Sequence, residues 1–121
     1  MLNLDTHILL YALAGTLRPR ERELLSRELW SVSAIVRWEI CKLQQLGRIE
    51  IDLDQREVKR IFGRLHTWPL SWEVCRASCQ LDVRGDPADE LIAATSIVYD
   101  VPLVSRDREL RKSRKIPFAT M

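Results

Sequence analysis

The sequence predicts an α/β fold with a short central parallel sheet and helices on both faces. Short apolar runs alternate with longer segments of helical periodicity, and short connections join them. The period near 3.6 is clearest in residues 34–46, which Gly47 follows as a C-cap. The chain has 121 residues, of which 46% are hydrophobic, so one core is expected, in one domain over residues 1–121.

The N-terminal half predicts two strands, each followed by helices. Its expected elements, in order, are a strand at 2–4, a helix at 8–13, a helix at 20–28, a strand at 30–33 and a helix at 34–46. The first strand is an apolar run that ends at Asp5, and Thr6 is a possible N-cap for the helix after it. The helix at 20–28 is charged but keeps Leu24, Leu25 and Leu29 at helical spacing, which is typical of an amphipathic surface helix.

The C-terminal half continues this alternation of helices and strands. Its expected elements, in order, are a brief extended piece at 49–51, a helix at 54–65, a strand at 67–70, a helix at 72–81, a helix at 86–99, a buried strand at 101–105, a short basic helix at 106–114 and a possible last strand at 116–119. The helix at 86–99 has the clearest start, because Asp86 can cap it and Pro87 is favoured at the first helical position.

Composition and charge exclude several classes of protein. The longest apolar run, residues 8–15, is far shorter than the roughly 20 residues of a membrane helix, and Asp5 interrupts any signal-peptide pattern, so a cytoplasmic protein without membrane contact is expected. Cys41, Cys75 and Cys79 lack CxxC spacing and are expected to be reduced core thiols. The net charge of +2 is modest, but 15 of the 19 basic residues are Arg. That bias suits a phosphate-bearing partner and also follows from a GC-rich genome.

Carboxylates stand where the expected strands end. Asp5 closes the first strand, and Asp107 lies two residues beyond the strand at 101–105. Parallel sheets bind ligands at the carboxyl ends of their strands, so both side chains should face one edge. Glu39 borders the apolar stripe of its helix, where a carboxylate without a partner would be costly.

Asp86 and Asp89 add two more acids in the first turn of one helix. Taken singly, each of the five acids has an ordinary explanation as a cap, a partner of the helix dipole or a loop residue. If they converge, they repel one another by several kcal/mol unless a cation lies between them. Oxygen ligands without His or Cys favour Mg²⁺, with Mn²⁺ as a possible substitute.

The order and spacing of these acids match a known family in four segments, LNLDTHILLYAL, VSAIVRWEI, DPADELIAATS and VPLVSRDREL. On these segments, which span nearly the whole chain, it resembles PIN-domain ribonucleases and specifically VapC-type toxins of bacterial toxin–antitoxin pairs. The resemblance implies a three-layer α/β/α PIN-like domain. It also implies an acidic quartet that binds Mg²⁺, made of Asp5, Glu39, Asp89 and Asp107.

The same resemblance implies further roles and partners. Asp86 would be an accessory metal ligand, Ser105 would orient a carboxylate or a metal-bound water, and Thr6 would support the first acid. The activity implied is a metal-dependent endoribonuclease, a hydrolase in which metal-activated water cleaves RNA. The protein would form a homodimer and be silenced by a cognate antitoxin. Departures from the family pattern occur at Arg84, where His is frequent, and at Glu90, where a basic residue is frequent.

A basic strip beside the last acid supports an RNA substrate independently. Arg106, Arg108 and Arg111 follow Ser105 and could contact phosphates. A solvated helix face explains the same pattern equally well.

Two other functions fit parts of the sequence. A phosphatase of the haloacid dehalogenase type would place a nucleophile at Asp5, but it needs a second Asp where this chain has His7 and a Lys that is missing. A catalytically inactive PIN-like module that binds RNA or protein is the other, and the presence of every quartet position disfavours it.

Overall fold

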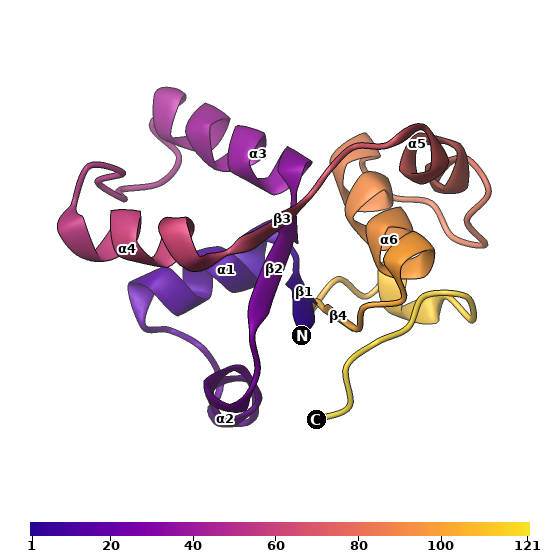
Figure 1. The fold of residues 1–121 in the computed structure, drawn as a ribbon, viewed down its shortest axis with the longest axis horizontal. Helices are drawn as coiled ribbons and strands as arrows, with labels where there is room; N and C mark the ends of the chain where they lie inside the picture. The colour runs from indigo at the N-terminus through magenta and orange to yellow at the C-terminus, as the bar shows by residue number, and fades with distance from the viewer.

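A computed structural model describes residues 1–121 and folds them around a four-stranded, fully parallel sheet (Figure 1). The strand order is β3-β2-β1-β4. The strands are β1 (Leu2–Leu4), β2 (Trp30–Ser33), β3 (His66–Trp68) and β4 (Leu103–Val104). All four are short, and β1 lies between two neighbours.

Helices cover both faces of the sheet. They are α1 (Thr6–Ala14), α2 (Pro19–Arg27), α3 (Ala34–Gln45), α4 (Arg56–Arg64), α5 (Trp72–Ser78) and α6 (Pro87–Tyr99), with a 3₁₀ turn at Leu110–Lys112. Figure 1 shows α1 to α4 on one side of the strands and α5 and α6 on the other. The predicted three-layer α/β/α fold is therefore confirmed. None of these helices has the length and apolarity needed to cross a membrane.

The topology creates a point at which the strand order reverses. From β1 through β2 to β3 the chain steps toward one edge, and α1 to α4 make these connections. It then returns across the whole sheet to β4 through α5 and α6. Right-handed crossovers require these two sets of helices to lie on opposite faces. The neighbouring ends of β1 and β4 therefore form a switch point, where parallel α/β sheets bind their ligands.

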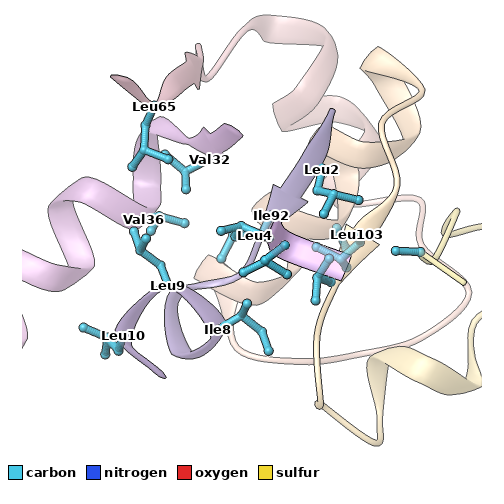
Figure 2. Packing of buried hydrophobic residues seen from close by; sticks show 14 of the residues in the cluster. Leu2, Leu4, Ile8, Leu9, Leu10, Val32, Val36, Leu65, Ile92 and Leu103 are labelled. Carbon is cyan, nitrogen blue, oxygen red and sulfur yellow. The ribbon is translucent and has the colours of Figure 1, made fainter. Parts of the chain in front are cut away.

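The core surrounds β1, whose three residues are all buried. Leu4, Ile8 and Leu9 pack with Ile92 and Leu103 in one cluster of 18 buried residues (Figure 2). Asn3, in the middle of the strand, donates to the Ile92 carbonyl at 3.1 Å and to Ser96 Oγ at 2.9 Å. Apolar packing and these two bonds together fix α6 against the central strand.

The segment after β4 differs from the predicted helix at 106–114. It is a loop that contains a single 3₁₀ turn, because local side chains satisfy its backbone amides. Ser105 Oγ accepts from the amide of Asp107, and Asp107 Oδ1 accepts from the amides of Glu109 and Leu110. The possible strand at 116–119 is reduced to one bridge between Phe118 and Leu103.

Two further local expectations are wrong. Residues 49–51 form no strand. Cys41 and Cys79 are exposed and Cys75 is half-buried, so none of these free thiols belongs to the core. Cys41 lies at an exposed position of α3, and Cys79 lies beyond the last residue of α5.

Leu4→Ala should lower the free energy of unfolding by about 3 kcal/mol, because this fully buried side chain leaves a cavity beside β1. Urea unfolding followed by circular dichroism measures the change. Leu29→Ala is the matched control, since Leu29 is 72% exposed and its truncation should cost less than about 0.5 kcal/mol. Equal losses in the two variants would contradict the assigned core.

Candidate active site

Asp5 leaves β1 directly at the switch point and caps α1. Its Oδ1 accepts from the Ile8 amide at 2.8 Å, so Asp5 takes the capping position expected for Thr6. The residue is only 7% exposed. Burial raises the pKa of Asp5, while hydrogen bonding by Ser105 and the Ile8 amide opposes that increase. A buried carboxylate with a raised pKa at this position is a candidate for metal binding or acid–base chemistry.

Thr6, the first residue of α1, reaches across to α3. Its hydroxyl donates a short hydrogen bond to Oε1 of Glu39, which lies half-buried in the second turn of that helix. This bond restricts the rotamers available to a long side chain. It also explains how Glu39 can border the apolar stripe of α3 without being left unpaired.

Asp89 faces the same region from the N-terminal turn of α6. Burial and, in decreasing order of size, the charges of Asp107, Glu39, Asp86 and Asp5 together raise its pKa to about 6. Each of the other four acids predicted for the site therefore lies close enough to repel Asp89. Carboxylates from four segments of the chain therefore lie near one another, and three of them line one pocket.

Asp107 and Ser105 belong to the loop that leaves β4. Ser105 is 2% exposed and lies beside Asp5, whose pKa its hydrogen bonding lowers. Asp107 uses Oδ1 to hold the two backbone amides of the 3₁₀ turn, which leaves Oδ2 available. The loop is thus fixed by its own side chains rather than by a helix.

Asp86 stands at the N-cap position of α6 and is exposed. Its side chain makes no capping hydrogen bond, so the ordinary explanation of this acid as a cap is not realised. It contributes to the pKa shift of Asp89 and lies at the outer edge of the group.

A pocket of about 290 Å³ opens between these elements. Its lining residues are Asp5, His7, Ile8, Tyr11, Asp89, Arg106 and Asp107. Glu39 lies outside this lining but is joined to the site through Thr6. A pocket of about 330 Å³ between α3 and α4 contains no acid and lies apart from this chemistry.

Two of the three arginines expected to contact RNA already have partners. Arg106 binds the carboxylate of Glu21 through Nε and a terminal nitrogen at 2.8 and 2.6 Å. Arg111 donates to the Ser105 carbonyl at 3.0 Å. Arg108 is exposed and makes no side-chain bond.

Glu21 and Tyr11 lie beside the site, although the sequence pattern does not predict a role for either residue. Glu21 is nearly fully buried, and its hydrogen bonds with Arg106 hold the pKa of its carboxyl below the usual range. The Arg106 guanidinium lies 4.0 Å from the centre of the Tyr11 ring. The one local signal was the position of Glu21 at the third residue of α2, where it accepts from the Arg18 amide in a capping box.

The donor atoms of the site fit a hard divalent cation. Its acids supply carboxylate oxygens only, which suit Mg²⁺ or Mn²⁺. The mutual repulsion expressed in the pKa of Asp89 is the kind that a bound cation relieves. In the arrangement seen, no three acidic, His or Cys side chains lie close enough to bind one ion, so metal binding requires side-chain rotation.

The chain belongs to the PIN domain family, whose model matches residues 3–116. PIN domains are generally nucleases and generally use a divalent metal. No curated protein sequence matches the chain significantly.

Solved structures share the fold at low sequence identity. A toxin–antitoxin complex from Klebsiella pneumoniae is 16% identical, with a TM-score of 0.68 over 90% of this chain and 89% of that one. VapBC2 from Rickettsia felis, bound to a DNA fragment from their promoter, is 21% identical, with a TM-score of 0.71 over 98% of each chain. FitAcB from Neisseria gonorrhoeae is 18% identical, with a TM-score of 0.70 over 99% of this chain and 97% of that one.

Asp89→Asn should stabilise the metal-free protein at pH 8 and have little effect at pH 4. The folded-state pKa of about 6 exceeds the unfolded value of 3.8. The folded state therefore binds the proton more tightly, and this contribution to stability is complete below pH 3.8 and is lost as the pH rises through 6. Asn, which cannot ionise, avoids the loss. Thermal unfolding of both proteins in EDTA across this range measures the difference.

Asp54→Asn is the control for that experiment, because the Asp54 side chain is 92% exposed and lies outside the site. The difference in unfolding temperature between Asp54→Asn and the unmodified protein should be the same at pH 4 and at pH 8. If Asp89→Asn behaved in the same way, the proposed convergence of charges on Asp89 would be wrong.

Proposed function

We propose that this protein, as one domain over residues 1–121, is a Mg²⁺-dependent endoribonuclease and the toxin of a toxin–antitoxin pair. The observation that carries the proposal is the convergence of acids from β1, α3, α6 and the loop after β4 on one switch point, where they raise the pKa of Asp89. Membership of the PIN domain family supports the nuclease activity. The shared fold with toxin–antitoxin structures supports the biological role.

Each site residue has a role that its contacts suggest. Mg²⁺, when bound, would lower the pKa of a water molecule and offset charge on the phosphodiester. Asp5 and Asp89, which line the pocket, would be the principal ligands, with Asp107 beside them. Ser105 lies beside Asp5 and lowers the pKa of its carboxyl, and so would hold that carboxylate in the orientation required.

Glu39 and Asp86 complete the proposed ligand set from two different helices. Thr6 restrains Glu39, so this acid would enter as a ligand or orient a water molecule from a fixed direction. Asp86 is exposed and unrestrained, which suits an accessory role at the entrance.

RNA is the proposed substrate, and the basic side chains near Asp107 would bind its phosphates. Arg108 is the best placed of the three, since it is exposed and makes no side-chain bond. Arg106 lines the pocket, and its charge is shared with Glu21. Arg111 donates to the Ser105 carbonyl, so its main role would be to hold the conformation of the loop rather than to bind phosphate.

A cognate antitoxin and a second copy of the chain are the proposed protein partners, in the cytoplasm. Several large apolar side chains are exposed, and the four most exposed are Leu29, Trp38, Leu46 and Trp72. Trp is enriched at protein interfaces relative to the rest of the protein surface, which supports Trp38 and Trp72 as contacts for a partner. The similar VapBC2 structure is itself a complex bound to promoter DNA.

The alternatives explain less. An inactive PIN-like module would have no need for acids that raise one another's pKa, because their repulsion costs stability without return. A haloacid dehalogenase-type phosphatase needs an acid two residues after Asp5, and His7 occupies that place, exposed at the pocket.

Asp5→Asn should abolish Mg²⁺-dependent cleavage of RNA, a loss of at least about 10³-fold, because the ligand at the centre of the site loses its charge. Cleavage of total cellular RNA, with and without EDTA, provides the measurement. Asp52→Asn, on an exposed acid of the loop before α4, is the control and should cleave normally. Undiminished cleavage by a folded Asp5→Asn protein would refute the site.

Expression of the protein alone should slow bacterial growth, and expression of Asp89→Asn should not. The reason is that toxicity requires RNA cleavage, and Asp89 is one of the two principal ligands proposed. Growth curves at matched protein levels, checked by immunoblot, make the comparison. Equal toxicity of the two proteins would show that growth arrest does not depend on this site.

A further inference from the structure

Glu21 is the most unusual acid of the chain outside the candidate site. Of the 17 acidic residues, only Asp5 and Glu21 are classed as buried, at 7% and 2% exposure. Burying a carboxylate is unfavourable unless it is paired and hydrogen-bonded. Glu21 meets that condition, because its two oxygens accept from two Arg106 nitrogens and from the Arg18 amide.

Arg106 brings this buried pair to the wall of the acidic pocket. It stands between Ser105 and Asp107 in the chain and lines the pocket together with Asp5 and Asp89. It is the one Arg or Lys side chain in that lining. Three contacts hold the guanidinium away from the acids: two bonds to Glu21 and the Tyr11 ring 4.0 Å beneath it.

A guanidinium in that pocket without Glu21 would have other partners available. Arginine forms its best pairs with carboxylates, in which two nitrogens meet two oxygens. The nearest unpaired carboxylates would be those of the pocket itself. Pairing with them would place a fixed positive charge where a divalent cation is expected, and the two would compete.

We propose that Glu21 is a positioning residue that sequesters Arg106 and thereby keeps the acidic pocket open to a divalent cation. The inference rests on the proposed metal-dependent function and adds to it a residue from α2, 85 positions away from its partner in sequence. The pair also restrains the loop of Asp107, since it ties the neighbouring Arg106 to α2. Glu21 itself touches neither metal nor substrate.

Mn²⁺ binding measured by isothermal titration calorimetry tests the proposal on the full chain. Glu21→Gln keeps the shape of the side chain but removes the charge that holds Arg106, and should weaken Mn²⁺ binding about tenfold. The double variant Glu21→Gln/Arg106→Gln removes the competing cation as well, and should bind Mn²⁺ within about threefold of the unmodified protein. Glu23→Gln, on an exposed face of the same helix, is the matched control and should change nothing.

The outcomes separate a sequestering role from a merely structural one. Equal Mn²⁺ affinity in Glu21→Gln and the unmodified protein would overturn the inference, and so would a double variant as weak as the single one. Circular dichroism verifies folding at the temperature of the titration. If Glu21→Gln does not fold, Glu21→Asp replaces it in the titration. The Asp side chain keeps the charge but is too short for both bonds to Arg106, so Mn²⁺ binding should weaken a few-fold. Unchanged Mn²⁺ binding by Glu21→Asp would contradict the proposal.

Failure of the proposed function gives a different result from failure of this inference. If the unmodified protein binds no Mn²⁺, the metal site is wrong and the role of Glu21 falls with it. If the unmodified protein binds Mn²⁺ and all variants bind equally, the metal site stands and the role of Glu21 alone is refuted.

Discussion

Repulsion between carboxylates at one point of the sheet is the constraint around which the rest of the molecule is arranged. Two unit charges 4 Å apart interact by about 4 kcal/mol at an effective dielectric constant near 20. A domain of this size is stabilised by a net free energy of only about 5–15 kcal/mol. Ionised acids that lie near one another therefore cost part of that free energy when no cation is bound, and the core around β1 must offset this cost.

The strand order determines where in the molecule the carboxylates meet. The carboxyl end of β1 lies beside that of β4, and α6 begins nearby because it returns antiparallel to the strands. The positive end of the α6 dipole favours an acid in its first turn by about 0.3–1 kcal/mol. The pKa of Asp89 is nevertheless raised, so burial and four neighbouring charges outweigh the dipole. Dipole compensation alone therefore does not account for this residue.

Much of the fold and the acidic group could be predicted from sequence because both depend on local patterns. Strand ends, helical periods and Asp86-Pro87 at a helix start are all visible within about ten residues. The pair of Glu21 and Arg106 could not be predicted, since 85 residues separate the two and the pattern of α2 favours a solvated Glu. The charges of residues 106–114 fit a helix face and so predict a helix, but Ser105 and Asp107 bond the backbone of this segment and hold it as a loop.

The contacts of that loop also change how its positive charge can be used. Six basic side chains form a strip in the sequence of this loop, but four of them already have partners. Arg106 binds Glu21, Arg111 binds the Ser105 carbonyl, Lys112 binds Glu109 and Lys115 binds the Gln80 carbonyl. Arg108 and Arg114 make no side-chain bond and remain available for phosphates. Counterion release scales with the number of phosphates neutralised, so two arginines supply only weak, sequence-independent attraction. Most of the binding energy for an RNA substrate must therefore come from the site and from surfaces outside this loop. The geometry of the acidic pocket is then more important for the activity than the net charge near it.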